Sequence, residues 1–138
     1  MIPIKQTLFG EIKGNCFPAS LASILEVSIE SVPHFCFLYN ADNWFIETNK
    51  WLTKNFGLSL IGITMPENIK HEIFQSPVYY MITGKSPRGQ FDHCCVGYMG
   101  KLVHDPHPSN DGLETIKYYE FFVSLLSTGK KINEEFTS

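Results

Sequence analysis

Four cysteines supply the most nucleophilic side chains in this chain of 138 residues: Cys16, Cys36, Cys94 and Cys95. Cys16 differs from the others because Asn15, a preferred N-cap residue, precedes it and Pro18 falls in what would be the first turn of a helix. The start of a helix carries partial positive charge and unpaired N–H groups, both of which stabilise a thiolate. Many cysteines at such positions are inert, but among these four the sequence favours Cys16 as the nucleophile.

A histidine and an aspartate downstream complete a possible catalytic group. His93 begins one strand-like run, and Asp105 follows a second, shorter one. If residues 98–100 form a three-residue hairpin loop, His93 and Asp105 lie opposite each other on one face. A carboxylate placed there fixes the tautomer of the imidazole and stabilises the imidazolium. A two-residue loop would instead place Asp105 opposite Cys94, on the other face, so this prediction depends on one residue of register.

Short motifs carry a resemblance to a known superfamily: Gln6-Thr7, Gly14-Asn15-Cys16-Phe17-Pro18-Ala19, Asp92-His93 and His104-Asp105-Pro106. Over roughly residues 1–108 this pattern resembles the papain-like cysteine peptidases, most nearly their small bacterial and phage members. The resemblance implies a nucleophile, base and orienting acid in the chain order Cys, His, Asp. It also implies an oxyanion donor upstream of the nucleophile. That role falls to Gln6, although its separation from Cys16 exceeds the usual spacing and requires the loop between them to fold back.

The elements that position these residues follow from the patterns around them. Apolar and small residues predict a buried helix that starts at Cys16, and a longer helix is expected from about Ala41 to Asn55, ended by Gly57. Helices followed by mostly antiparallel strands predict an α+β fold, which the resemblance specifies as papain-like with N-terminal helices packed on the sheet. The other expected elements are strands at 58–64, 77–83, 91–98 and 101–104, and helices at 29–32, 66–74 and 118–127.

The composition fits one domain over residues 1–138, with a polar tail after about residue 129 that we expect to be frayed. Hydrophobic residues make up 43% and charged residues 18%, which is ordinary for a globular protein. A net charge of -3 without a basic patch argues against a nucleic-acid partner. No long apolar run or signal-like N-terminus occurs, which predicts no membrane association and a cytoplasmic location with reduced thiols.

Four further residues are candidates for contact with a substrate: Asn15, Trp44, Arg88 and His107. Arg88 lies in the loop before His93 and could meet a carboxylate or phosphate, with a solvated cation as the competing interpretation. His107 lies in a proline-containing loop beside the site. Trp44 could line a groove, but its seven-residue spacing from Trp51 favours packing in the core.

A metal site built from the cysteines and histidines near residues 92–107 is the weaker alternative. Structural zinc sites usually contain two cysteines separated by two to four residues, and Cys94 and Cys95 are adjacent, with side chains on opposite faces of a strand. We therefore predict neither a metal nor a cofactor. Cys36 is expected to be a buried hydrophobic residue.

Together these features predict a thiol-dependent hydrolase of the peptidase or amidase type. Cys16, His93 and Asp105 would attack an amide or isopeptide bond through a thioester intermediate, in a peptide, a protein or a small amide. Deamidases and acyltransferases use the same three residues. The alternative is a catalytically silent papain-like module that binds a peptide or small ligand in the same groove.

Overall fold

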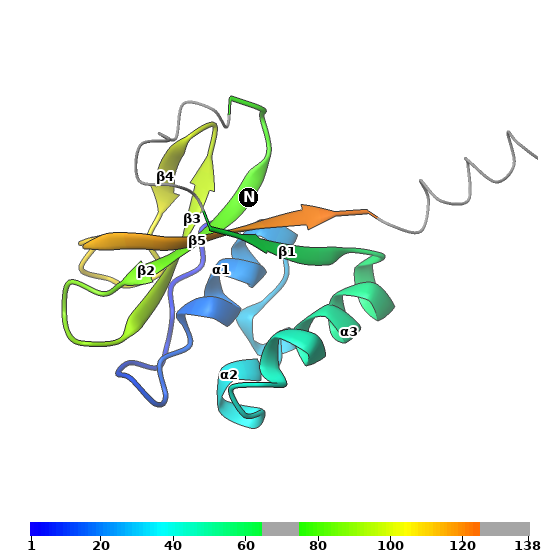
Figure 1. Cartoon of the computed structure of the whole chain (residues 1–138), viewed down its shortest axis with the longest axis horizontal. Coiled ribbons are helices and arrows are strands. Elements are labelled where there is room, and N and C mark those ends of the chain that lie inside the picture. The colour runs from blue at the N-terminus through cyan, green and yellow to red at the C-terminus, as the bar shows by residue number, and fades with distance from the viewer. Residues whose placement is uncertain (65–74, 125–138) are drawn as a thin grey trace, which may run out of the picture.

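The computed structural model describes residues 1–64 and 75–124, and Figure 1 shows the arrangement of the elements. The helices come first: α1 (Cys16–Leu25), the 3-10 helix η1 (Ile29–Ser31), α2 (Phe35–Leu38) and α3 (Trp44–Phe56). The strands follow: β1 (Ser59–Ile63), β2 (Tyr79–Lys85), β3 (Asp92–Tyr98), β4 (Lys101–His104) and β5 (Thr115–Val123). The predicted α+β class, with N-terminal helices packed on a sheet, is confirmed. The expected helix at 66–74 and the tail after about residue 129 lie outside the described residues.

The five strands form one antiparallel sheet in the order β1-β5-β2-β3-β4 (Figure 1). The last strand of the described residues, β5, therefore lies inside the sheet between β1 and β2. The prediction of a helix from Tyr118 was wrong, because residues 115–123 pair along both of their edges. This segment is rich in tyrosine, phenylalanine and β-branched residues, which favour strands.

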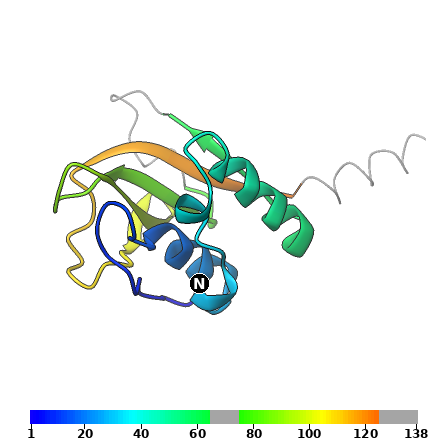
Figure 2. The same ribbon diagram turned by 90° about the horizontal axis from the view of Figure 1, so that it is seen from below.

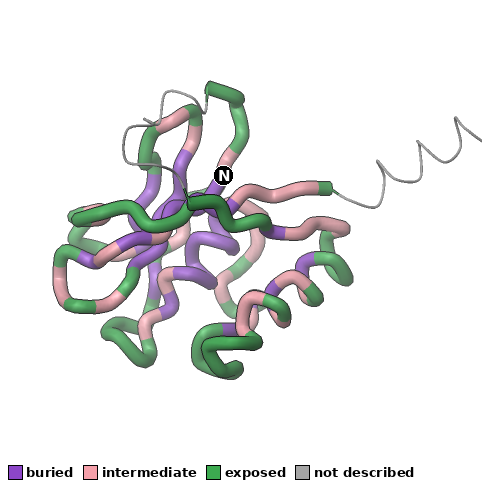
Figure 3. The backbone as a smooth tube through the Cα atoms, in the orientation of Figure 1, coloured by how far each residue is buried: buried purple, intermediate pink, exposed green. Residues whose placement is uncertain are grey.

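Helix α1 is the central element on the helical side of the sheet, as Figure 2 shows. Its residues from Phe17 to Ser23 are all buried, and Figure 3 shows this continuous burial. Small side chains let the helix approach β3 closely enough for the Ser20 hydroxyl to donate to the carbonyl of Cys94 at 3.3 Å. The core between helices and sheet is formed by Phe17, Leu21, Ala22, Val32, Phe35, Leu52, Leu60, Met81 and Cys94.

The β3–β4 hairpin has a two-residue loop, so the expected three-residue loop was wrong. Met99 and Gly100 both have positive φ, 49° and 80°, as a tight primed turn requires. The pairing then shifts by one residue between Val96 and Gly97, and Val103 is the extra residue on β4. This bulge reverses the faces of the residues that follow it. Continued past His104, the register places Asp105 opposite Cys95, on the face that Cys95 shares with His93.

A helix that spans a membrane must be long and apolar over about 20 residues. Within residues 1–64 and 75–124 no single helix meets both conditions. Helix α1 and the segment Ile29–Leu38 pass the test by length and composition only as a pair, bent by 107°.

Candidate active site

A buried histidine–carboxylate pair forms the centre of the site. His93 Nε2 lies 2.7 Å from Asp105 Oδ1, and the two side chains are only 2% and 3% exposed. Asp105 Oδ1 also accepts the backbone N–H of His107 at 2.9 Å, and Oδ2 accepts that of Gly112 at 2.8 Å. Three donors therefore hold the carboxylate, which fixes the plane and tautomer of the imidazole.

The electrostatics of the pair favour the charged forms of both groups. Burial alone would lower the pKa of His93, but hydrogen bonds with Asp105, Cys16 and Cys95 outweigh it and raise that pKa to about 11. Burial alone would raise the pKa of Asp105, but the hydrogen bonds from His93, His107 and Gly112 hold it well below its usual range. At neutral pH the pair is therefore an imidazolium beside a carboxylate.

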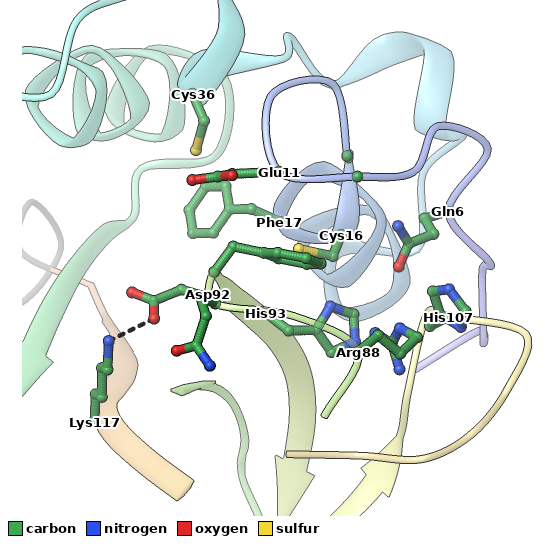
Figure 4. Close-up of a pocket in the computed structure, with 14 residues that line it drawn as sticks. Gln6, Glu11, Cys16, Phe17, Cys36, Arg88, Asp92, His93, His107 and Lys117 are labelled. Atoms are coloured by element: carbon green, nitrogen blue, oxygen red, sulfur yellow. Dashed lines mark hydrogen bonds and ion pairs between the residues drawn. The ribbon is translucent and has the colours of Figure 1, made fainter. Parts of the chain in front are cut away.

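Cys16 is the half-buried first residue of α1 and lines the same cleft as His93 (Figure 4). Because Asp105 engages Nε2 of His93, Nδ1 is the ring nitrogen left to exchange a proton with the Cys16 thiol. The cleft has a volume of about 480 Å³, which is within the range of small-ligand sites. Its walls are formed by Gln6, Gly10, Glu11, Gly14, Cys16, Phe17, Cys36, Arg88, Gln90, Phe91, Asp92, His93, His107 and Lys117.

Asn15 is at the N-cap position of α1, but its side chain does not cap the helix. Its Oδ1 instead accepts the backbone N–H groups of Thr7 and Leu8, each at 2.9 Å, and its Nδ2 donates to the Thr7 hydroxyl at 2.9 Å. Asn15 is buried and is not among the residues that line the cleft. Its contacts fold the loop back on α1, which brings the preceding segment to the cleft wall despite the long separation in sequence.

Gln6 lies on this wall and is itself buried. Its Nε2 donates to the carbonyl of Leu8 at 2.8 Å, which leaves one N–H of the amide for another acceptor. Its Oε1 has no hydrogen-bond partner among the described residues. The backbone N–H of Gln6 donates to the carbonyl of Pro106 at 2.9 Å, which ties this segment to the loop that carries Asp105.

Lys5 strengthens the same connection. Its ammonium group donates to the carbonyls of Asp105 at 2.8 Å and His107 at 3.1 Å, and to the side chain of Asn110 at 2.7 Å. Residues 5–8 thus bridge the start of α1 and the loop after β4. Signals for this bridge were present in the sequence as a lysine and a glutamine, but neither residue type specifies a partner a hundred residues away.

The other residues proposed to contact a substrate divide into two groups. Arg88 and His107 line the cleft, and the His107 ring meets that of His93 edge-on with centroids 6.2 Å apart. Trp44 is not a lining residue; it packs at right angles on Phe17, with centroids 5.1 Å apart, and joins the core. The structure therefore agrees with the packing interpretation of Trp44.

Two cysteines have surroundings that the sequence analysis did not anticipate. Cys36 was expected to be buried but is exposed on α2 and lines the cleft. It is on a helix too short to show a periodic pattern, so its orientation was not readable from sequence. Cys95 is buried beside the histidine–carboxylate pair, and the strand alternation that puts it on the face of His93 was a usable signal.

His93, Cys95 and Asp105 form the one group in the described part of the chain with the composition of a metal site. Their ligand atoms all lie within 4.8 Å of one another. Both oxygens of Asp105 and Nε2 of His93 already take part in hydrogen bonds, however, and burial raises the pKa of the Cys95 thiol. These contacts fit a hydrogen-bonded pair with a neutral thiol better than a set of metal ligands.

Comparisons with known proteins add nothing to these observations. No protein-family model, no curated protein sequence and no solved structure matches this chain. The geometry of the cleft is therefore the main indication of its chemistry.

Proposed function

We propose that this protein is a cysteine hydrolase of the peptidase or amidase type, in which Cys16 is the nucleophile, His93 the proton carrier and Asp105 the orienting acid. The observation that carries the proposal is the buried 2.7 Å contact between His93 and Asp105 beside a cleft that Cys16 also lines. A nucleophile, a base and a third group that orients the base are the parts that covalent acyl transfer requires.

The proposed reaction has two steps. The Cys16 thiolate forms a bond to the carbonyl carbon of an amide, and the amine leaves with a proton from the His93 imidazolium. A water molecule then attacks the thioester while neutral His93 accepts its proton. The carbon–sulfur bond breaks, the acid product leaves and the thiolate is regenerated beside the imidazolium.

Two donors are proposed for the oxyanion that forms in each step. Cys16 begins α1, where backbone N–H groups have no acceptor within the helix, so its own N–H is one candidate. Gln6 Nε2 is the other, since only one of its two N–H bonds is used by Leu8. Removal of one such donor costs on the order of 3 kcal/mol of transition-state stabilisation.

The proposal includes the papain-like interpretation of the fold and a peptide, protein or small amide as the substrate. It also includes a cytoplasmic location, because all four cysteines are unpaired and a reactive thiol needs reducing surroundings. Deamidation or acyl transfer would use the same three residues with a different leaving group or acceptor.

The test is the rate of alkylation by iodoacetamide between pH 5 and pH 9, with the adduct located by peptide mapping. A short unstructured peptide with one cysteine is the reference thiol, because burial and the neighbouring Cys16 raise the pKa of Cys36 to about 12. We expect Cys16 to react many times faster than the reference peptide at pH 6 in the wild-type protein, and His93→Ala to remove most of that advantage.

Labelling of Cys16 in wild type that is no faster than labelling of the reference peptide at pH 6 would contradict the hydrolase proposal. It would leave a silent module that binds a peptide or small ligand in the cleft. Cys16→Ser provides the control for the assignment of the adduct.

A further inference from the structure

The charged groups of the cleft are distributed unevenly around Cys16. Glu11, Asp92 and Lys117 lie on one side of it, and Arg88 and His107 lie on the other (Figure 4). Lys117 is paired with Asp92 at 2.6 Å, so the cation on that side is already neutralised. On the opposite side, the guanidinium of Arg88 is 4.0 Å from a carboxylate oxygen of Asp111, a looser contact than the one between Lys117 and Asp92.

Arg88 is largely enclosed, and its hydrogen bonding is incomplete. Its side chain is 23% exposed, and Nη1 donates to the neutral hydroxyl of Ser109 at 3.0 Å. The nearest carboxylate oxygen, on the exposed side chain of Asp111, is 4.0 Å away, which is too far for a hydrogen bond. A guanidinium has five N–H donors, so most of them remain available within the described part of the chain.

The loop that carries Arg88 is held in place by a buried serine. Ser86 is fully buried; its hydroxyl accepts the backbone N–H of Arg88 at 3.1 Å, and its own N–H donates to the carbonyl of Phe91 at 2.9 Å. These two bonds close the loop between β2 and β3, which places the arginine directly before the strand that carries His93. Arg88 is thus a positioned cation rather than one at a free loop tip.

His107 completes this side of the cleft as a neutral donor. Burial and the positive charge of Arg88 lower the pKa of His107, so its ring is uncharged at neutral pH. Nδ1 accepts the backbone N–H of Ser109 at 3.1 Å, which leaves the proton on Nε2. One cation and one neutral donor match a single negative charge spread over two oxygens better than a doubly charged phosphate.

We propose that Arg88 and His107 form a carboxylate subsite, so that the substrate carries a carboxylate next to the bond that Cys16 attacks. This inference rests on the proposed hydrolase function and narrows its substrate to acidic amides. Peptides with a free C-terminus or with an acidic side chain beside the scissile bond belong to this class.

The test compares two alkylating reagents that differ mainly in charge, iodoacetate and iodoacetamide, at Cys16 and pH 7. The ratio of the two rates cancels changes in the reactivity of the thiol itself. We expect Arg88→Gln to lower the ratio of iodoacetate to iodoacetamide by about five-fold, since a unit charge several ångströms from the reagent contributes on that order. Added salt should reduce the difference.

Two variants act as controls. Arg88→Lys keeps the charge without the planar fork, so its ratio should lie between those of wild type and Arg88→Gln. Lys54→Gln removes a cation from the last turn of α3 and makes the same change in net charge, and it should leave the ratio at the wild-type value. Thermal unfolding of each variant shows whether the protein remains folded.

The outcomes separate the two proposals. A reactive Cys16 whose ratio is the same in wild type and folded Arg88→Gln would overturn the carboxylate subsite alone, as would an equal fall in Lys54→Gln. A Cys16 that reacts slowly with both reagents in wild type would overturn the hydrolase proposal and the subsite with it.

Discussion

His93 and Asp105 are in contact although they are not opposite each other in the hairpin register. The bulge at Val103 puts Asp105 opposite Cys95, one diagonal step along the sheet from His93, and a 2.7 Å hydrogen bond spans that step. The contact depends on a carboxylate that three donors hold in place. Its main consequence is that the pKa of His93 is raised from 6.5 to about 11, so the imidazolium persists well above neutral pH.

The titration of His93 should therefore depend on Asp105. Asp105→Asn keeps the shape of the side chain but removes the charge that raises the pKa of His93. In wild type the His93 ring signals, followed by NMR, should not titrate below pH 9, since the pKa is about 11. In Asp105→Asn we expect the pKa of His93 to fall well below 11, because only the contacts with Cys16 and Cys95 then oppose the effect of burial.

The same pair predicts a pH dependence of stability. The raised pKa of His93 stabilises the fold fully below its unfolded value of 6.5 and loses that contribution as the pH rises towards 11. The lowered pKa of Asp105 stabilises the fold fully above 3.8 and loses that contribution on further acidification. The free energy of unfolding that Asp105→Asn forfeits should therefore be largest between about pH 4 and 6.5. Urea unfolding at pH 5.5 and 9.5 measures this, and a larger loss at pH 9.5 would contradict the assignment.

Asn15 is predicted to position the segment that carries Gln6. Asn15→Ala removes three hydrogen bonds and should lower the free energy of unfolding by roughly 1–3 kcal/mol. Asn15→Asp keeps the acceptor and should lose less. Hydrogen exchange provides the local measurement: the amides of Thr7 and Leu8 should lose protection in Asn15→Ala and keep most of it in Asn15→Asp. Equal protection in both variants would mean that other contacts hold the loop.

Glu120 is a buried carboxyl that works against stability at neutral pH. It lies in β5, where Oε1 accepts from the Thr83 hydroxyl at 2.8 Å and Oε2 has no hydrogen-bond partner among the described residues. Burial raises its pKa from 4.5 to about 7, so the folded state binds more protons than the unfolded state between these values. Stability should then fall as the pH rises from 4.5 to 7.

Glu120→Gln should remove this dependence. At pH 8 we expect the variant to be more stable than wild type by at most about 3 kcal/mol, and at pH 4.5 by little. Glu30→Gln, on an exposed residue of η1, is the matched control. An equal gain at both pH values would show that folding does not raise the pKa of Glu120.

Elements set by local patterns were predictable from the sequence, and those set by distant partners were not. The spacing of apolar residues and a terminal glycine predicted the helices α1 and α3, and β-branched residues predicted the strands β1 to β4. These elements appear where expected apart from shifts at their ends. β5 was not predicted from the sequence, because tyrosine and phenylalanine at residues 118–122 are also compatible with one face of a helix. Only pairing with β1 and β2, which lie far away in the chain, selects the strand.

The site shows the same division. Cys16 and His93 were proposed from their local surroundings and line one cleft, but the contacts of Asn15 were not foreseen. A short amide side chain can cap the helix that follows or bind the loop that precedes it, and both choices look alike in sequence. The contact between Asp105 and His93 was expected for the wrong reason, since a three-residue loop and a two-residue loop with a bulge both put Asp105 on the face of His93.

Insertion of one alanine between His104 and Asp105 tests whether the register of the hairpin places Asp105. Val96 pairs with His104, so the inserted residue would lie opposite Cys95 and Asp105 would lie opposite Cys94, facing away from His93. The rate of Cys16 alkylation by iodoacetamide at pH 6 should then fall to the level of His93→Ala. Deletion of Val103 removes the bulge but keeps Asp105 opposite Cys95, so it should preserve the wild-type rate. If the insertion variant is folded and keeps that rate, Asp105 does not depend on the register to reach His93.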